Sequence, residues 1–429
     1  MSPTHIEELS VILVAPNVSE QMGGEAIKAL HIYLELKRKG VRVYQITHDR
    51  VQSELEHKFP EMQVAYVRDT KLQIILNRIP LLRSSLGLIF LWKAAQLLKH
   101  ILKERPGSIV HFVAPVSPVL PYFRIPGARV VIGPLNGNIH YPPAFRHLES
   151  FSYKLRRWTH PIMQFFCRFA MQGKQYAEVL LVAGGERTYK SLRICGCRDE
   201  QFVDSIDSGV LDRLHAAPRI SHAGGNLRFF QNGRMVQHKG TALVIKALKK
   251  TQNPIEFHVI GRGPELKNLK TLTESLGLQD RVRFVEWVPD HSKLAEMLRG
   301  YRAFVFPSLA EANGIVVQEA MVQGMPVIAL NWGGPALLVT HETGVLIDPV
   351  SEEYVVTQLA HAMDLLAIDG DLAERMSIAG RTRALKEGYL WSDLIDDWIS
   401  VYECVNAKHP IERHLAGACS QSGSDSYAK

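Results

Sequence analysis

The feature that most constrains the fold is an alternation of buried strand-like runs and helical patterns, which occurs twice along the chain. The first series opens with the β-branched run Ser10 to Ala15, a glycine loop, a helical pattern closed by Gly40, and a second strand from Val41 to Thr47. A strand, a helix and a strand in this order form a parallel βαβ unit. The second series starts at Leu227. Together they predict an α/β protein with two facing, Rossmann-like, doubly wound domains and a cleft between them.

The length of 429 residues suits two or three domains. We expect an N-terminal Rossmann-like domain over residues 1–210 and a C-terminal one over residues 227–388. Between them, residues 211–226 lose periodicity and are rich in Pro, Gly, His and Ala, which is typical of a linker. Residues 389–408 are predicted to form a final helix, and the small, polar residues 409–429 to be disordered.

Composition narrows the function classes. Hydrophobic residues make up 46% and charged residues 22%, which excludes wholesale disorder. The net charge of +7 suits an anionic partner: a phosphorylated ligand, a nucleic acid or an acidic lipid surface. Five scattered cysteines predict a reducing compartment. Cys195-Gly196-Cys197 has no second Cys or His pair at zinc spacing, which disfavours a structural zinc site. With no secretory signal and no apolar span of about 20 residues, we expect a cytoplasmic protein.

The most informative stretch contains two glutamates, Glu311 and Glu319, separated by seven residues. Glu311 follows the predicted strand Ala303 to Pro307, so it is expected at the carboxyl edge of a parallel sheet, where ligands bind. Gly314 and Ile315 would present backbone N–H groups at a helix N-terminus, which attracts phosphate. The same spacing also fits an ordinary helix start with a solvated acidic face.

A second loop adds positive charge. Arg234 and Lys239 lie in the segment Asn232 to Gly240, directly after the first strand of the second series. Two cations there could neutralise a diphosphate leaving group, although they could equally be surface cations. The turn at Gly261 to Pro264 is too short for a dinucleotide fingerprint.

These segments together resemble the retaining GT-B glycosyltransferases called family 4, or glycosyl transferases group 1. The resemblance covers most of the chain and is densest from about Phe229 to Asp348. It is carried by GRMVQHKG, FHVIGRGPE, RVRFVEWVP, the glutamate pair, and EAMVQGMPVIA followed by GG and TGVLI. The resemblance implies a GT-B fold whose first domain binds the acceptor and whose second binds a nucleotide sugar. It also implies that the helix over residues 389–408 crosses back toward the first domain.

The resemblance also implies roles for residues of the second series. Arg234 and Lys239 would hold the donor diphosphate and stabilise the departing nucleotide. Glu311 would contact the donor sugar, Glu319 the ribose hydroxyls, and Gly314–Ile315 the phosphates. No cofactor and no metal ion is implied.

In the first series, Gly23 and Gly24 would let their loop approach the diphosphate and the reacting sugar. His111 matches a histidine that relatives carry near the sugar and the acceptor. A histidine at a strand end is also compatible with a structural role. Asn136 and Asn138 would line the acceptor side, although turn chemistry explains that segment equally well.

The chain departs from its relatives in two places. Asn313 stands where an aromatic residue is frequent, and Gly333-Gly334 leads into Pro335 to Leu338 rather than to an acidic residue. Both departures leave the identity of the donor sugar open. The first loop, Gly23-Gly24-Glu25, lacks the G-x-G-x-x-G pattern, which disfavours a dehydrogenase.

Two basic segments, 71–105 and 154–174, interleave Lys and Arg with aromatic and aliphatic residues. Such segments suit an anionic membrane surface, unless their apolar residues are core and their cations merely solvated. Nucleic acid is disfavoured because no recognition helix or RNA-binding aromatic motif is present.

The sequence thus predicts a cytoplasmic, bacterial, retaining and metal-independent glycosyltransferase, peripheral at the inner face of the cell membrane. It would use a nucleotide diphosphate sugar and a lipid-linked or glycan acceptor in the synthesis of cell-surface polysaccharide or glycolipid. Two alternatives stay open: a phosphorylase-like GT-B enzyme, and a non-catalytic, nucleotide-binding scaffold of polysaccharide assembly.

Overall fold

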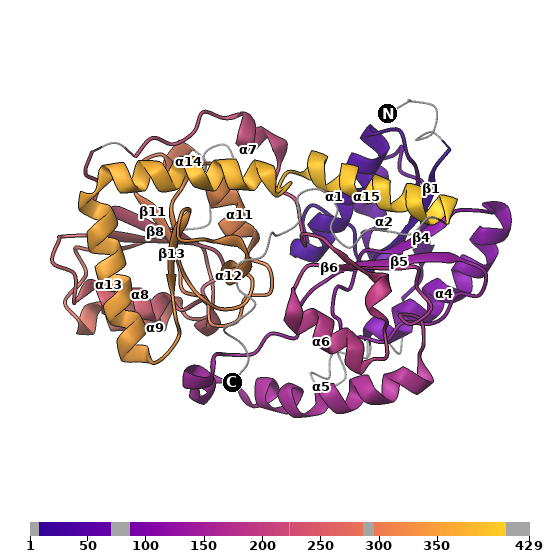
Figure 1. Cartoon of the computed structure of the whole chain (residues 1–429), viewed down its shortest axis with the longest axis horizontal. Coiled ribbons are helices and arrows are strands. Elements are labelled where there is room, and N and C mark those ends of the chain that lie inside the picture. Colours follow the sequence, from indigo (N-terminus) through magenta and orange to yellow (C-terminus); the bar gives the residue numbers. More distant parts are fainter. Residues whose placement is uncertain (1–7, 70–85, 223, 286–295, 409–429) are drawn as a thin grey trace. The chain divides into compact units, whose positions relative to one another are not determined.

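The computed structural model describes residues 8–69, 86–222, 224–285 and 296–408 (Figure 1). The described chain divides into two compact units. The first contains the chain up to Asn138, Arg156–Ser208 and the segment from Trp391, and the second contains Ile139–Leu155 and Gly209–Leu390. The predicted tail 409–429 lies outside the described residues.

The first unit is built on a seven-stranded sheet in the order β3-β2-β1-β4-β5-β6-β7, and every pairing is parallel. Its strands are β1 Ser10–Val14, β2 Arg42–His48, β3 Val64–Val67, β4 Ile109–Phe112, β5 Arg129–Leu135, β6 Val179–Val182 and β7 Phe202–Asp204. The order reverses at β1, which pairs with β2 on one side and β4 on the other. Such a reversal places ligand-binding loops at the carboxyl ends of the central strands.

Helices alternate with these strands. They are α1 Gly24–Arg38, α2 Gln52–Lys58, α4 Leu86–Glu104, α5 Phe151–Ala170 (which belongs to this unit from Arg156 onward), α6 Glu186–Ile194 and α15 Trp391–Ala407, with short 3₁₀ turns η1 Asp49–Val51 and η4 Asp199–Gln201. α1 follows its sequence pattern closely: Leu30, Ile32 and Leu36 are buried, and Lys37 and Arg38 occupy the last turn, where cations favour the helix dipole. The predicted βαβ opening is therefore present.

The second unit contains a six-stranded parallel sheet in the order β10-β9-β8-β11-β12-β13. Its strands are β8 Arg228–Asn232, β9 Glu256–Ile260, β10 Val282–Val285, β11 Ala303–Phe306, β12 Val327–Leu330 and β13 Gly344–Ile347. Its helices are η3 Pro143–Leu148, α7 Asp212–Ala216, η5 Gln237–Lys239, α8 Thr241–Leu248, α9 Leu266–Ser275, α11 Ile315–Val322, α12 Pro335–Leu338, α13 Glu352–Ile368 and α14 Gly370–Lys386. The order reverses again, between β8 and β11. The prediction of two doubly wound parallel sheets is confirmed.

Residues 211–226, expected to be a linker, are attached to the second unit. The segment contains α7, and the Ile220 N–H donates to the Gln323 carbonyl at 3.1 Å. Arg219 forms an ion pair with Glu374, which holds the pKa of that carboxyl at about 2. Tertiary hydrogen bonds thus order a segment whose composition alone resembles a loop.

The final helix, α15, packs on α1 of the first unit. The Trp398 indole N–H donates to the Ser205 hydroxyl at 3.0 Å, and the ring of Trp391 stacks on His31 with centroids 5.6 Å apart. Among the helices of the described residues, none is both long and apolar enough for a bilayer crossing.

Candidate functional site

The carboxyl edge of the second sheet is a set of loops joined by backbone hydrogen bonds. The Gly233 N–H donates to the Ile260 carbonyl at 3.0 Å, and the Leu309 N–H donates to the His238 carbonyl at 2.7 Å. The loops after β8, β9 and β11 therefore support one another. These three loops lie at the edge where parallel sheets bind ligands, and their hydrogen bonds hold their residues in place there.

Glycine makes this close approach possible. Gly240 has φ of +70°, and a Cβ there would lie 2.1 Å from the Pro307 carbonyl oxygen. A Cβ on Gly261, whose φ is +140°, would lie 2.1 Å from the Gly233 oxygen. Any larger residue would separate these loops, since real contacts are never so short.

The centre of this edge is an ion pair between Lys239, in η5, and Glu311, in the loop after β11. The two side chains are only 19% and 18% exposed, and the Lys239 ammonium lies 4.8 Å from the centre of the Phe306 ring. Opposite charges this close compensate one another's desolvation. The ammonium retains two further N–H donors that an anion could engage.

Arg234 adds a second cation on the same loop. Its side chain is exposed, and no ion pair or hydrogen bond to its guanidinium is present among the described residues. Burial lowers the pKa of His238 from 6.5, and the positive charge of Lys239 lowers it further. Glu311 acts in the opposite direction, and Arg234 contributes a smaller lowering. Both cations therefore act on the same region and disfavour the charged form of the histidine between them.

The N-terminus of α11 lies beside this pair in the chain. Gly314 caps the helix in the left-handed conformation, with φ of +89°, which a glycine adopts without strain. The first N–H groups of a helix have no intrahelical acceptor, so Gly314 and Ile315 offer the donors that attract phosphate. The structure places the predicted residues Lys239, Glu311 and Gly314–Ile315 on adjoining loops.

The glycine pair Gly333-Gly334 fixes the loop that carries Glu311. The Gly334 N–H donates to the Glu311 carbonyl at 2.8 Å, and a Cβ on Gly333 would lie 2.4 Å from that same oxygen. A Cβ on Gly334 would lie 2.1 Å from the Asn313 carbonyl oxygen. The sequence alone predicts no role for this pair. Two adjacent glycines after a buried strand were the available signal.

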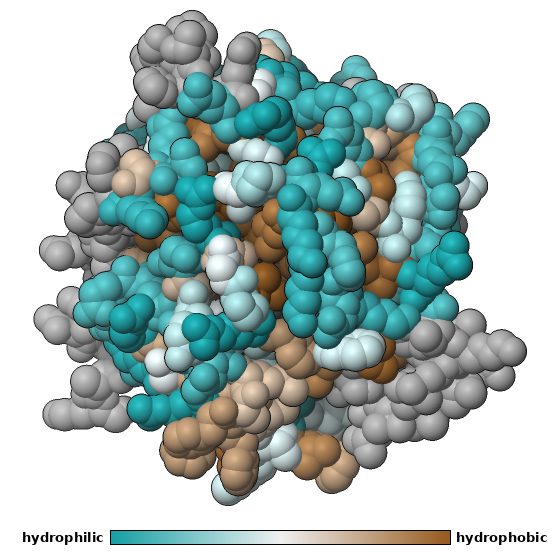
Figure 2. Space-filling model, turned by 90° about the vertical axis from the view of Figure 1, so that its right-hand side faces the viewer, coloured by the Kyte–Doolittle hydropathy of each residue, from teal (hydrophilic) through white to brown (hydrophobic). Residues whose placement is uncertain are grey.

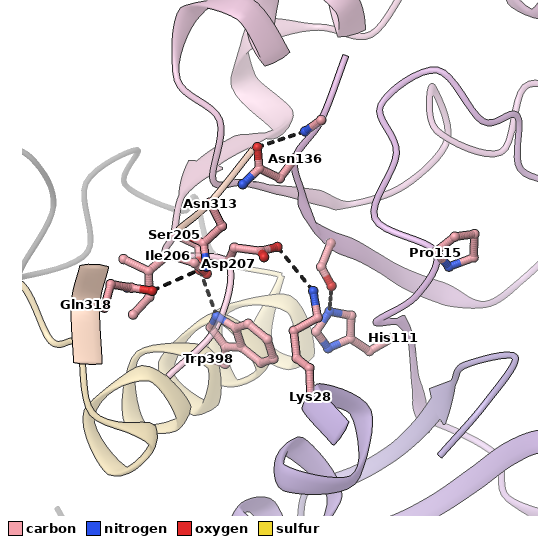
Figure 3. A network of polar contacts seen from close by, with 12 residues as sticks. Lys28, His111, Pro115, Asn136, Ser205, Ile206, Asp207, Asn313, Gln318 and Trp398 are labelled. Atoms are coloured by element: carbon pink, nitrogen blue, oxygen red, sulfur yellow. Dashed lines mark hydrogen bonds and ion pairs between the residues drawn. The ribbon is translucent and has the colours of Figure 1, made fainter. Parts of the chain in front are cut away.

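Glu319 and Asn313 complete this part of the site. Glu319 lies one turn after Ile315, and burial raises the pKa of its carboxyl to about 7. No ion pair to this carboxylate is present in the described residues. The Asn313 amide donates to the Gln318 side-chain oxygen at 3.3 Å, so a polar contact occupies the position where the family resemblance makes an aromatic residue frequent (Figure 3).

In the first unit, Gly23 and Gly24 lie exposed at the start of α1. Gly23 has φ of −64° and ψ of 171°, an extended conformation open to any residue. A Cβ at either position would meet no protein atom within 4 Å. Neither backbone strain nor crowding inside the protein requires glycine here. This is compatible with the predicted approach to a ligand, which stays a prediction.

His111 is fully buried in the first unit (Figure 3). Its Nδ1 lies 2.6 Å from the Tyr402 hydroxyl and its Nε2 lies 2.9 Å from the Gly133 carbonyl oxygen. Burial lowers the pKa of His111 to about 3, so the ring is neutral. These contacts support the structural role that the sequence left open, and the catalytic role stays an unsupported prediction.

Asn136 and Asn138 follow β5. Asn136 is buried, and its side-chain oxygen accepts hydrogen bonds from the Gly137 N–H at 2.8 Å and from Arg187 at 2.6 Å. Asn138 has a left-handed φ of 51°, which asparagine adopts readily in turns. Turn chemistry therefore accounts for Asn138, and acceptor contact by either residue stays a prediction.

One ion pair in the first unit was missed from the sequence. Lys28, on the buried face of α1, lies 3.1 Å from the Asp207 carboxylate (Figure 3). A lysine at an inward helical position was the available signal, because a buried ammonium requires a partner.

Two other features of the described residues have the chemistry or the shape of a binding site. Among the described residues, His48, Asp49 and Asp69 could together contact a metal ion. Asp69, however, already pairs with the Arg50 guanidinium at 2.7 Å. A cavity of about 550 Å³ lies along α9, from Gly263 to Glu274, and is lined by none of the predicted site residues. We therefore place the candidate site at the Lys239–Glu311 loops.

The candidate site lies within a segment that matches a known protein family. Residues 216–383 match the model of a family described as Glycosyl transferases group 1. The match includes Arg234, Lys239, Glu311 and Glu319. The predicted resemblance to group 1 glycosyltransferases is thus supported for this segment, whereas family 4 and a retaining mechanism stay predictions.

A curated relative is the lipopolysaccharide core biosynthesis glycosyltransferase LpsD of Rhizobium meliloti (strain 1021). It is 34% identical over 171 residues, which is 40% of this chain and 48% of LpsD. The chain thus spans about half the length of this relative.

Solved structures are similar over nearly the whole chain. WaaG, a glycosyltransferase involved in lipopolysaccharide biosynthesis, has a TM-score of 0.62 at 18% identity, covering 91% of this chain and 99% of WaaG. Anabaena Alr3699/HepE in complex with UDP-glucose has a TM-score of 0.59 at 17% identity, covering 92% of this chain and 100% of that one. At such identities the likeness shows the fold alone, and the predicted GT-B fold class is confirmed.

Proposed function

We propose that this chain is a retaining glycosyltransferase that moves a sugar from a nucleotide diphosphate sugar to a hydroxyl group of a lipid-linked or glycan acceptor. The observation that carries the proposal is the Lys239–Glu311 pair, beside Arg234 and the α11 N-terminus, inside the segment that matches the group 1 model. The complex of HepE with UDP-glucose supports a nucleotide sugar as the class of donor.

The donor diphosphate would bind at the cations of the second sheet edge. Lys239 and Arg234 would neutralise the diphosphate, and the Gly314–Ile315 N–H groups would donate to its oxygens. Glu311 would accept hydrogen bonds from sugar hydroxyls, and its position is fixed by Lys239. Glu319 would accept from the ribose hydroxyls.

Transfer would break the bond between the sugar C1 and the diphosphate oxygen and form a bond from C1 to the acceptor oxygen. The acceptor hydroxyl would pass its proton to the departing phosphate oxygen. Negative charge grows on the diphosphate as the bond breaks, so Lys239 and Arg234 would stabilise the transition state more than the ground state. These cations would do this without a metal ion.

The acceptor side is proposed on the first unit, with Gly23 and Gly24 permitting close approach of the donor. We place the enzyme in the cytoplasm, at an anionic membrane face where a lipid-linked acceptor would be presented, in cell-surface polysaccharide or glycolipid synthesis. The net charge of +7 supports such a location.

The proposal is tested by screening nucleotide sugars for thermal stabilisation and then measuring transfer with the donor that binds. Replacing Lys239 or Arg234 by Ala should lower kcat/KM by about 10²-fold or more, because each removes charge stabilisation of the leaving group. Lys386→Ala, an exposed lysine on α14, is the matched control and should retain normal turnover.

Other outcomes identify the alternatives. Near-normal transfer by both Lys239→Ala and Arg234→Ala would contradict the assigned roles. Release of a sugar phosphate in the presence of inorganic phosphate would indicate a phosphorylase-like enzyme. Donor binding without transfer or hydrolysis from any donor of the panel would indicate a non-catalytic scaffold.

A further inference from the structure

Two helices of the basic segments, α4 and α5, look alike in the sequence but differ in the structure. Both interleave cations with bulky apolar residues. In α4 the apolar residues face the core of the first unit, and those that are buried are Phe90, Leu91, Ala94, Ala95, Leu98 and Ile101. α4 thus has the ordinary orientation of a helix packed on a sheet. Residues 71–85 of the same basic segment lie outside the described residues.

In α5 the orientation is inverted. The buried residues of this helix are Gln164 and Cys167, and the Gln164 amide donates to the carbonyl and the hydroxyl of Ser191, on α6. The large apolar side chains are instead exposed: Phe151, Leu155, Trp158, Ile162, Met163, Phe165, Phe166 and Phe169. A polar side chain holds α5 to the protein while its apolar side chains face outward.

The exposed side chains form one stripe. All of them except Met163 follow the spacing i, i+4, i+7, i+11, i+14, i+15 and i+18 from Phe151, which places them within an arc of roughly 100° on a helix. Figure 2 shows apolar side chains gathered at the lower edge of the molecule, where Figure 1 places α5. A contiguous apolar surface of this kind marks a protein or membrane contact.

The charges of α5 have a single sign. Lys154, Arg156, Arg157 and Arg168 lie on the helix, and no Asp or Glu occurs from Phe151 to Ala170. A second copy of the chain docked on this face by two-fold symmetry would bring the same cations together without an acidic partner. An anionic lipid surface instead attracts each of them.

We propose that α5 lies in the surface of an anionic lipid bilayer, with its apolar stripe at the boundary between headgroups and acyl chains. Aromatic side chains favour this boundary, and four of the stripe are Phe and one is Trp. Binding of α5 to lipid does not depend on the proposed function. Only its purpose does, since membrane binding would bring the enzyme to a lipid-linked acceptor. Vesicle binding is measured without donor or acceptor, so the two can fail separately.

The first experiment is flotation of the full chain with phosphatidylcholine vesicles, with and without phosphatidylglycerol. The wild type should float with the anionic vesicles and dissociate as salt is raised. Phe166→Ser combined with Phe169→Ser should lower binding by about tenfold or more, because the variant loses two exposed apolar side chains that the bilayer would bury. Ile368→Ser combined with Ile378→Ser, two exposed apolar residues on α13 and α14, is the matched control and should bind normally.

The second experiment identifies the helix that enters the bilayer. Trp158 on α5 is 72% exposed and Trp92 on α4 is 52% exposed. Brominated acyl chains should quench the tryptophan fluorescence of the bound protein. Trp158→Phe should remove most of this quenching, whereas Trp92→Phe should leave it.

Three results would overturn the inference: no flotation with anionic vesicles, equal flotation of the Phe166/Phe169 variant, or quenching that depends on Trp92 alone. A further contrary result is a wild-type dimer in solution that the Phe166/Phe169 variant abolishes, with neither protein binding vesicles. The stripe would then be an interface between copies.

Discussion

The strand order of both sheets reverses at the first strand of the unit, but the carboxyl edges of the two sheets hold their polar residues differently. In the second unit, Lys239 and Glu311 come from separate loops, meet at the edge and keep part of their surface exposed. In the first unit, His111 lies on β4 with both ring nitrogens bonded inside the protein, and Gly23 and Gly24 leave their surroundings open. The edge of the second sheet thus presents charged side chains to a ligand, whereas the glycine loop of the first unit leaves room for one.

A position at a strand end therefore does not by itself make a residue functional. His111 and Glu311 both occupy the expected place in a doubly wound sheet. Their local partners make the difference. Tyr402 and Gly133 form hydrogen bonds with both ring nitrogens of His111, whereas Lys239 and a glycine-fixed loop hold Glu311 at the edge.

The largest effect is expected at the charged edge. Glu311→Gln should lower kcat/KM by about 10²- to 10³-fold, because it removes the charge that orients Lys239 and that we propose contacts the donor sugar. The melting temperature should also fall, because the mostly buried Lys239 ammonium loses the charge that compensates its desolvation, although the amide keeps the shape of the carboxylate. The measurement is steady-state transfer with the donor found by screening. Turnover within threefold of wild type would place the sugar elsewhere.

A stability effect is expected from the buried histidine. His111→Ala should lower the free energy of unfolding by about 2–5 kcal/mol, because it leaves a cavity and unpaired Tyr402 and Gly133 groups. Denaturant unfolding measures this loss. Turnover per folded molecule should stay within a few fold of wild type. A folded variant with a 100-fold loss of turnover would make His111 catalytic after all.

A substitution in the glycine loop of the first unit should have a smaller effect on activity. It should lower kcat/KM without lowering stability. Gly24→Ala should leave stability unchanged or raise it slightly, since alanine favours a helix and meets no neighbour. If the loop approaches the donor, kcat/KM should fall by about tenfold. Gly87→Ala, near the start of α4, is the matched control, with only ordinary contact to Leu120. Unaltered kcat/KM in Gly24→Ala would remove the glycine loop from the donor site.

The smallest effect concerns pH. The pKa of Glu319 is raised from 4.5 to about 7 in the folded protein, so the folded state binds a proton more tightly than the unfolded state. Stability contributed by this group is therefore present at low pH and is lost as the pH rises from about 4.5 through about 7. Glu319→Gln should flatten this part of the plot of Tm against pH, whereas the exposed Glu200→Gln should not. Parallel curves for wild type and Glu319→Gln would contradict the raised pKa.

Much of the fold could be predicted from the sequence, because buried parallel strands and amphipathic helices leave strong periodic patterns. β1, for example, begins at the predicted Ser10 and ends one residue before the predicted Ala15. Spacing also placed Glu311 and Gly314–Ile315 at a strand end and a helix start. These features depend on residues close together in the chain.

Other features depend on contacts between distant residues and could not be predicted. The pairing of Lys239 with Glu311 joins positions 72 residues apart, and the contact of His111 with Tyr402 joins positions 291 apart. Both basic segments were predicted to contact a membrane, because the sequence does not show which face of α4 or α5 packs on the sheet. Burial of Leu98 and exposure of Phe169 separate them.

The central claim is that a nucleotide diphosphate binds at the charged edge of the second sheet. A crystal structure of the protein with the donor or its nucleotide diphosphate tests this most directly. We expect a phosphate oxygen within hydrogen-bond distance of the Lys239 ammonium and of the Gly314 or Ile315 N–H. A nucleotide bound in the α9 cavity, or on the first unit away from these groups, would contradict it.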